Sequence, residues 1–287
     1  MRLLGGIARR LVWGTRATGN PWKIAENCRV ARSAPKPLRL RIAVSNLQNG
    51  IGTTRGYWDY LRTGWKYFGA HDSRALDGAV AFLKSERVDI AAFSEVNGAS
   101  WRTKGVDQVA LVANGGGIPE QVFFPTHVVG SRINQGNAVC SRFPVRFIAN
   151  HRLPGIGEPR HLSEAEITIH GLPVRVLATH LTLDLGQRAG QIHRIATLLG
   201  RADVRPTILA GDFNVSREEE MELLLETKLQ MATSAATFPA WRPRRRLDYL
   251  FFSSEFRIVA SHAYAGRLFS DHLPLVAEVE LEVPWVS

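Results

Sequence analysis

The chain of 287 residues is 45% hydrophobic, which is enough to form the core of one large domain or two small ones. It contains no apolar run near the ~18 residues that a membrane-spanning helix requires, so we expect no transmembrane segment. The net charge of +10 lies almost wholly in residues 1–41, which hold ten Lys and Arg and one acid, and the near-neutral remainder argues against tight binding of a nucleic-acid duplex.

Residues 1–37 are expected to form a basic N-terminal arm. Apolar residues such as Leu4, Ile7 and Leu11 would share one side of a helix with arginines on the other, a pattern that suits a helix on an anionic membrane surface. A frayed basic tail, or a helix packed on the body, is the alternative. Any peripheral membrane contact is therefore expected from residues 1–16.

The compartment follows from the start of the chain and from its cysteines. Arg9 and Arg10 interrupt the apolar start before it reaches the length of a signal-peptide core, so we expect a cytoplasmic protein, at most peripheral to the inner face of a membrane. Cys28 and Cys140 are too few for a disulfide framework, and we expect both to be reduced thiols. No obligate protein partner is evident.

Strand and helix patterns alternate in the first half of the body, which spans residues 38–287. Strands are predicted at 38–44, 88–93, 138–140 and 145–149, with two more in 164–181. Apolar residues at the spacing of one helix face predict a helix at 76–83. Six aromatic residues in 57–68 favour either local packing beneath a long loop or a rim that faces substrate or lipid. Gly115-Gly116-Gly117 predicts a flexible loop.

The second half continues this alternation. Apolar spacing predicts a helix at 192–199 capped by Gly200, and an acidic start predicts another at 218–228. Between them the apolar run Ile208-Leu209-Ala210 ends in Gly211-Asp212-Phe213-Asn214, so an acid and an amide leave the sheet at the carboxyl end of a strand. Strands are also predicted at 247–252, 258–264 and 275–283. Hairpins and helical crossings together indicate mixed sheets covered by helices.

Polar groups stand at or beyond the ends of several predicted strands. They are Asn46, Glu95, His180, Asp212, Asn214, Asp271 and His272, and Asp248 enters a further strand. Hard oxygen ligands with two imidazoles and no set of thiolates suit Mg²⁺, with Mn²⁺ as an alternative, better than zinc. Phosphoester cleavage needs such groups, because a metal must neutralise the phosphate oxygens and a base must prepare water. Each residue alone also fits a plain structural role as a turn former, strand-edge charge or core histidine.

Seven short motifs in order resemble the endonuclease/exonuclease/phosphatase superfamily with the DNase I-like fold. They span about residues 40 to 283 and are Ser45-Asn46, Ser94-Glu95-Val96, Gly136-Asn137-Ala138-Val139-Cys140-Ser141-Arg142-Phe143-Pro144, Thr179-His180-Leu181, Gly211-Asp212-Phe213-Asn214, Arg246-Leu247-Asp248-Tyr249 and Ser270-Asp271-His272-Leu273-Pro274. The resemblance implies an α/β fold, a four-layer sandwich of two mixed β-sheets flanked by helices, with 38–287 as the catalytic domain and its site at one end.

The resemblance also implies which residues handle the metal and the water. Glu95, helped by Asn46 and with Asp271 nearby, would hold the metal. Asp212 and Asn214 would position the attacking water and the phosphate. A metal-dependent hydrolase of phosphoester bonds, most of all phosphodiesters, is therefore expected.

The implied roles of the histidines leave one question open. His272, oriented by Asp248, would contact a phosphate oxygen or act as the base, and His180 would lie near the phosphate or the leaving group. Whether Asp212 or His272 takes the proton of the water stays open. Further substrate-binding candidates are Asn137, Arg188 and Arg246.

The substrate is less well defined, because the superfamily includes nucleases, sphingomyelin-cleaving enzymes and inositol-phosphate phosphatases, and a fold does not choose among them. A phospholipid or small phosphodiester competes with nucleic acid, DNA or RNA. A non-catalytic adaptor that uses the same fold is the alternative from another class.

Overall fold

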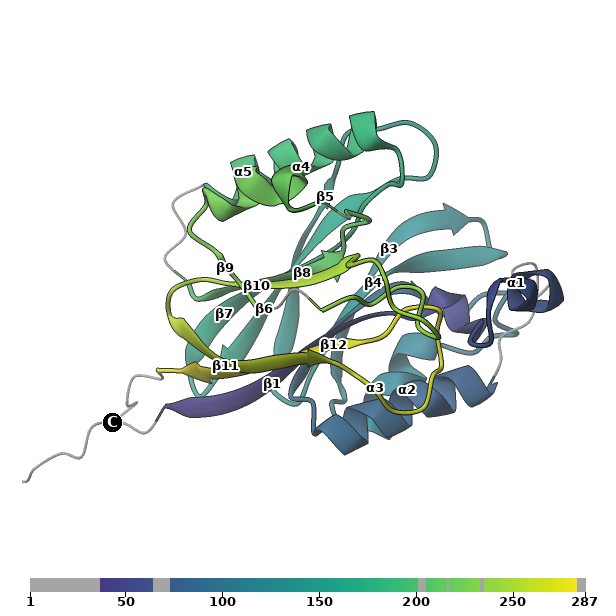
Figure 1. Cartoon of the computed structure of the whole chain (residues 1–287). Coiled ribbons are helices and arrows are strands. Elements are labelled where there is room, and N and C mark those ends of the chain that lie inside the picture. The colour runs from purple at the N-terminus through teal and green to yellow at the C-terminus, as the bar shows by residue number, and fades with distance from the viewer. Residues whose placement is uncertain (1–36, 64–72, 201–204, 216, 233–234, 283–287) are drawn as a thin grey trace, which may run out of the picture. The chain divides into compact units, whose positions relative to one another are not determined.

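The computed structural model describes residues 37–63, 73–200, 205–215, 217–232 and 235–282 (Figure 1). The predicted N-terminal helix, Cys28 and the second part of the aromatic segment 57–68 lie outside these residues. Among the described residues, no helix is long and apolar enough to cross a membrane.

Two six-stranded sheets form the centre of the fold, and both are mixed. The first contains, in spatial order, β11 (Phe256–Ala263), β12 (Leu275–Leu281), β1 (Leu38–Asn46), β2 (Ile90–Asn97), β4 (Ile133–Ser141) and β3 (Glu120–Val129). The second contains β5 (Val145–Arg152), β6 (His161–Ile169), β7 (Leu172–His180), β8 (Thr207–Asp212), β10 (Asp248–Phe252) and β9 (Gln230–Met231). The pairs β1–β2 and β7–β8 are parallel and the other neighbours are antiparallel.

Helices complete the described part of the fold. They are α1 (Tyr57–Thr63), α2 (Ser73–Glu86), α3 (Gln108–Gly116), α4 (Leu185–Leu199) and the single turn α5 (Glu222–Leu225), with the 3₁₀ turns η1 (Gln48–Gly50) and η3 (Glu218–Met221). In Figure 1, α2 and α3 cover the outer face of the first sheet and α4 covers the outer face of the second. Each central strand is therefore buried on both faces.

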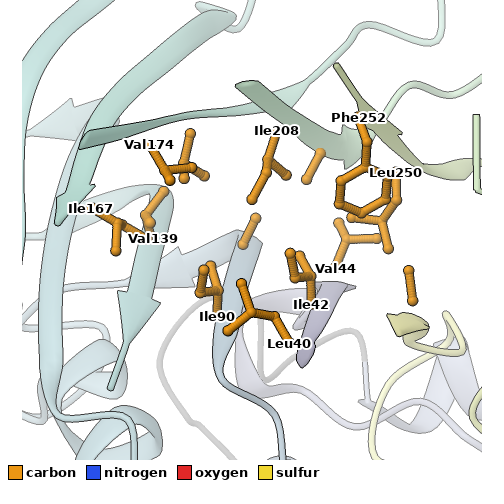
Figure 2. Packing of buried hydrophobic residues seen from close by; sticks show 14 of the residues in the cluster. Leu40, Ile42, Val44, Ile90, Val139, Ile167, Val174, Ile208, Leu250 and Phe252 are labelled. Atoms are coloured by element: carbon orange, nitrogen blue, oxygen red, sulfur yellow. The ribbon is translucent and has the colours of Figure 1, made fainter. Parts of the chain in front are cut away.

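The alternation of strand residues explains the layers. Leu40, Ile42 and Val44 of β1 point between the sheets toward residues of β8 and β10 such as Ile208 and Leu250 (Figure 2). The intervening side chains of the first sheet pack against α2 and α3, and those of the second sheet pack against α4. Because both faces are apolar, both are removed from water, and the predicted four-layer sandwich is confirmed.

Several strands and helices were predicted correctly, but some segments differ, among them 57–63, which forms α1 where a long loop was expected. Gly115 and Gly116 end α3 rather than forming a flexible loop, and Gly117 adopts a left-handed conformation that closes the helix. A side chain at Gly116 would collide with Leu83 of α2, so glycine allows the two helices to approach closely. The predicted strands did not include β3, and the predicted helix at 218–228 is reduced to η3 and α5.

Candidate active site

The carboxyl ends of parallel strands bring three predicted residues into one row. His180 at the end of β7 lies opposite Asp212 at the end of β8, and Asp248 at the start of antiparallel β10 lies on the other side of Asp212. A side chain at Gly211 would collide with the carbonyl oxygen of Thr179, so glycine there lets β8 lie close to β7 beside the site. Strand register therefore places two acids and a histidine side by side.

Groups from both sheets meet at Oδ2 of Asp212. Asn46 at the end of β1 donates its amide to this oxygen over 3.0 Å and to Oε1 of Glu95 over 3.2 Å. Nε2 of His180 lies 3.7 Å, and Nε2 of His272 3.8 Å, from the same oxygen. An amide, two imidazoles and two carboxylates therefore surround a single point at the end of the sandwich.

Two residues of this group have unusual backbone conformations. Glu95 (φ 49°) and Asn214 (φ 53°) are left-handed, a conformation that costs a residue with a side chain roughly 1 kcal/mol or more. Glu95 lies in a β-bulge, where the pairing of β2 with β4 shifts between Phe93 and Val96. Strain of this kind is common where a side chain must be directed into a functional site.

His272 is firmly oriented. Its Nδ1 lies 2.8 Å from Oδ2 of Asp248, and its ring packs against Phe238 with centroids 4.9 Å apart. The loop that carries Phe238 also receives a hydrogen bond from the amide of Leu273 to the carbonyl oxygen of Thr237. Burial opposes the charge on His272, but the Asp248 and Asp212 carboxylates outweigh it and raise its pKa to about 10.

Two carboxyl groups of the site have raised pKa values, because nearby positive charge does not offset their burial. Burial, with the negative charge of Asp271, raises the pKa of Glu95 to about 7. Burial also raises the pKa of Asp212 to about 6, although His272 opposes this. Acids whose ionised forms are disfavoured in this way fit a cation, because a bound cation would restore the charge balance.

Two sets of residues could hold that cation. Asp212, Asp248 and His272 have donor atoms that all lie within 4.8 Å of one another. However, the Asp248–His272 bond already uses Nδ1, and the raised pKa of His272 favours an imidazolium, which cannot bind a metal. Glu95 and Asp271, whose charges repel, are the second set that could hold a divalent cation.

Asn46 and Asn49 both stabilise Glu95. Oδ1 of Asn46 accepts the amide of Gln48 over 2.8 Å, so this amide presents its nitrogen to the carboxylates and would have to rotate to bind a metal through oxygen. Asn49 donates to Oε2 of Glu95 over 3.2 Å, and the buried guanidinium of Arg102 donates to Asn49 over 2.9 Å. Asn49 and Arg102 were not predicted, because nothing in their spacing marks them before the fold is known.

Arg160 is a further residue that the sequence analysis missed. Its Nη1 lies 2.8 Å from Nδ1 of His180, and its Nη2 donates to Glu158 over 3.1 Å. It directly precedes β6, where a lone arginine has no distinguishing pattern. Burial, with the charge of Arg160, lowers the pKa of His180 well below its usual value.

The other candidates fall in different places. Asn214 donates its side-chain amide to Leu181 and its backbone amide to Oδ1 of Asp212 over 2.9 Å, which ties it to the site. Asn137 is buried between the sheets and donates to Ser163 over 3.1 Å. Arg188 lies on α4 and donates to Glu220, and among the described residues it makes no hydrogen bond or ion pair with the cluster around Asp212.

Arg246 lies over an aromatic ring of the core. Its guanidinium carbon lies 5.9 Å from the ring centroid of Tyr249, whose side chain belongs to the core between the second sheet and α4. Asp248, two residues after Arg246, belongs to the site row. The substrate-binding roles of Arg188 and Arg246 therefore gain no support from their positions and stay predictions.

The fold and the site together are those of a hydrolase that acts on phosphoester bonds. The model of the Endonuclease/Exonuclease/phosphatase family matches residues 44–272, so the chain belongs to that family. The match includes every residue of the cluster around Asp212. A search of curated proteins finds no match.

Several solved structures are similar to this chain in fold, and their names indicate different activities. An endonuclease/exonuclease/phosphatase from Beutenbergia cavernae is 23% identical, with a TM-score of 0.65, and the match covers 85% of this chain and 72% of that one. The mannosyl-6-phosphatase Bt3783 of Bacteroides thetaiotaomicron is 16% identical (TM-score 0.60; 84% and 99% covered). The human Nocturnin catalytic domain is 18% identical (TM-score 0.60; 86% and 94% covered). At these identities the likeness establishes the fold and does not select a substrate.

Proposed function

We propose that this protein is a Mg²⁺-dependent phosphodiesterase that cleaves its substrate by attack of water. The observation that carries the proposal is the convergence of Asn46, His180, His272 and Glu95 around Oδ2 of Asp212. Two imidazoles meet two carboxylates at one end of the sandwich, and the pKa values of both carboxylates, Glu95 and Asp212, are raised. Such a combination is typical of a functional site rather than of a purely structural one. Phosphodiester hydrolysis requires such groups.

The residues would divide the work as follows. Glu95 and Asp271 would hold a divalent cation, which when bound would neutralise phosphate oxygens. Asp212 would orient the attacking water, with its own carboxylate fixed by the amides of Asn46 and Asn214. His272 would meet a phosphate oxygen or exchange a proton with the water, while Asp248 holds its ring.

Exposed apolar side chains near the site favour a lipid substrate. We define the apolar rim as Trp58, Leu61, Trp101, Ile156, Leu183 and Leu185, each at least 66% exposed. Figure 1 shows α1 and the β3–β4 turn on the same side of the fold, the side toward which β1 runs. Large apolar groups exposed together are costly in water unless they meet a partner.

Hydrogen bonds connect several rim segments with neighbouring loops and elements. The amide of Trp101 donates to Ser131 in the β3–β4 turn, and the side chain of Gln135 in β4 donates to Glu158. The amide of Ile156 donates to Gln187 at the start of α4. Trp58 and Trp101 could stack on bases, but the other four rim side chains are aliphatic and cannot, so this rim suits a lipid surface better than a nucleic acid.

Charge supports the same choice. Arg62, Lys104 and Arg132 are exposed beside or near rim residues. Cations next to apolar side chains are the usual combination for surfaces that bind anionic bilayers. An anionic phospholipid presented in a bilayer is thus the favoured substrate, and nucleic acid is the alternative.

A hydrolysis panel tests the function. The full-length protein should hydrolyse bis(p-nitrophenyl) phosphate and the phosphodiester of phosphatidylglycerol in vesicles with Mg²⁺, and should lose both activities in EDTA. Plasmid DNA and RNA should be cleaved more slowly. Faster cleavage of either nucleic acid would favour a nuclease, and inactivity on every substrate with both Mg²⁺ and Mn²⁺ would favour an adaptor.

A matched pair of variants separates the rim from the site. Trp101→Ser should lower hydrolysis of vesicle phospholipid and leave hydrolysis of bis(p-nitrophenyl) phosphate unchanged. Leu111→Ser changes an exposed apolar residue on α3 outside the rim and should affect neither. Equal vesicle hydrolysis by both variants would contradict a membrane-facing rim.

Metal binding should depend on pH. Because the pKa values of Glu95 and Asp212 are raised to about 7 and about 6, protonation of these acids stabilises the fold at low pH, and that stability is lost as pH rises through 6–7. Mg²⁺ binds the ionised form of Glu95, so its stabilising effect should grow as pH rises through the pKa of Glu95. At a Mg²⁺ concentration of ten times Kd, the free energy of unfolding rises by about 1.4 kcal/mol, which corresponds to roughly 3–6 °C in Tm.

Thermal unfolding with and without Mg²⁺ measures this effect. The rise in Tm should be near zero at about pH 5.5 and fully present at about pH 8. Glu95→Gln should abolish the rise, whereas Glu120→Gln, an exposed acid at the start of β3, should leave it intact. A rise of equal size at both pH values would contradict metal binding through Glu95.

A further inference from the structure

The two histidines of the site face the same oxygen but have opposite partners. Nε2 of His180 and Nε2 of His272 lie 3.7 Å and 3.8 Å from Oδ2 of Asp212. On the far side of the rings, Nδ1 of His272 meets a carboxylate oxygen of Asp248 and Nδ1 of His180 meets a guanidinium nitrogen of Arg160, each at 2.8 Å.

These partners assign the protons of the two rings. A carboxylate accepts hydrogen bonds, so Nδ1 of His272 must carry a proton, and Nε2 remains free to gain or lose one. A guanidinium only donates, so Nδ1 of His180 must be the acceptor and carries no proton. The single ring proton of His180 therefore lies on Nε2, which faces the site.

Arg160 is itself held in place. Its Nη2 donates to Oε2 of Glu158 over 3.1 Å, and Oε1 of Glu158 accepts from Gln135 over 3.3 Å. The backbone carbonyl oxygen of Arg160 accepts a hydrogen bond from the amide of Leu153 over 2.9 Å. The side chains of Arg160 and His180 are only 14% and 10% exposed, so water has little access to replace this contact.

We propose that Arg160 is a positioning residue that fixes the proton of His180 on Nε2. The inference rests on the proposed function for what this N–H meets, namely an oxygen of the substrate phosphate. His180 then acts as a fixed hydrogen-bond donor, and proton exchange belongs to His272 with Asp248. The two histidines of the site thus have different tasks.

Nitrogen NMR of ¹⁵N-histidine protein tests the assignment without any substrate. In the full-length protein at neutral pH without added metal, His180 should show an unprotonated Nδ1 and a protonated Nε2, with its signals identified by their loss in His180→Gln. Arg160→Met removes the donor and should give a mixture of tautomers. Arg160→Lys keeps a donor and should preserve the Nε2–H form.

Kinetics provide the second readout. Arg160→Met should lower kcat on bis(p-nitrophenyl) phosphate by about 10²-fold, and Arg160→Lys should recover most of it. His180→Gln keeps an N–H donor and should retain at least about tenfold more activity than His180→Ala. His272→Gln cannot exchange a proton and should resemble His272→Ala.

The outcomes separate this inference from the proposed function. A protonated Nδ1 on His180 in the unsubstituted protein, or an unchanged tautomer in Arg160→Met, would overturn the inference whatever the activity. Equal activities of His180→Gln and His180→Ala would also overturn it, because a group that transfers a proton cannot be replaced by an amide. Lack of hydrolysis with the expected NMR spectrum would reject the function alone.

Discussion

Replacing Asp212 by Asn is expected to lower kcat/KM for a phosphodiester by about 10³- to 10⁴-fold while the fold remains intact. The substitution keeps the size of the side chain and removes its charge. A neutral amide holds the attacking water less firmly than a carboxylate does, and it weakens the attraction for both imidazoles near Oδ2. The loss should therefore fall on the chemical step rather than on binding.

Stability should change little in this variant. The ionised carboxylate of Asp212 is disfavoured in the fold, because burial raises its pKa to about 6, and a neutral amide avoids that penalty. The hydrogen bond from Asn46 would be lost, which opposes the gain. Thermal unfolding should place Tm within a few degrees of that of the unsubstituted protein.

Asp184→Asn is the matched control. Asp184 caps the start of α4 by accepting the amide of Gln187 over 2.9 Å, and Asn caps helices about as well. This control should keep both activity and Tm. Near-normal hydrolysis by Asp212→Asn would contradict the assignment of water orientation to Asp212.

Local pattern predicted the strand ends and mixed sheets covered by helices, and the family resemblance implied the four layers. Alternating or continuous apolar runs identified β1, β2, β8 and β12, and strand ends of this kind meet at one edge of a sheet. The bulge at Glu95 and the glycines that end α3 were missed, because each depends on contact with a neighbour that is distant in the sequence. Tertiary packing decides such features.

The partners of the site residues were harder to predict than the residues themselves. Motifs of the family resemblance marked Asp248 and His272, and the structure joins them by one hydrogen bond. Arg160 carries no motif, and its contact with His180 arises because the pairing of β6 with β7, with Leu162 opposite Thr179, brings the residue before β6 beside the end of β7. The hydrogen-bond partner of a histidine determines which ring nitrogen carries the proton. The sequence could therefore predict the site residues but not the protonation of each ring.

Asp248→Asn should reveal which form of His272 is active. Removing this carboxylate takes away the largest attraction that raises the pKa of His272 to about 10, so the imidazolium should lose its proton at lower pH. We expect kcat to fall by about 10²- to 10⁴-fold, in line with the loss of a carboxylate that orients a histidine. If the imidazolium is the working form, the alkaline limb of the pH–rate profile should move to lower pH.

A double-substitution cycle provides the control for this experiment. Asp248 makes its side-chain hydrogen bond in the site to Nδ1 of His272, so Asp248→Asn in a His272→Gln background should cause little further loss. Additive losses would show that Asp248 acts independently of His272. A shift of the acid limb instead of the alkaline limb would identify neutral His272 as the group that takes the proton of the water, and Asp212 would then serve to orient that water.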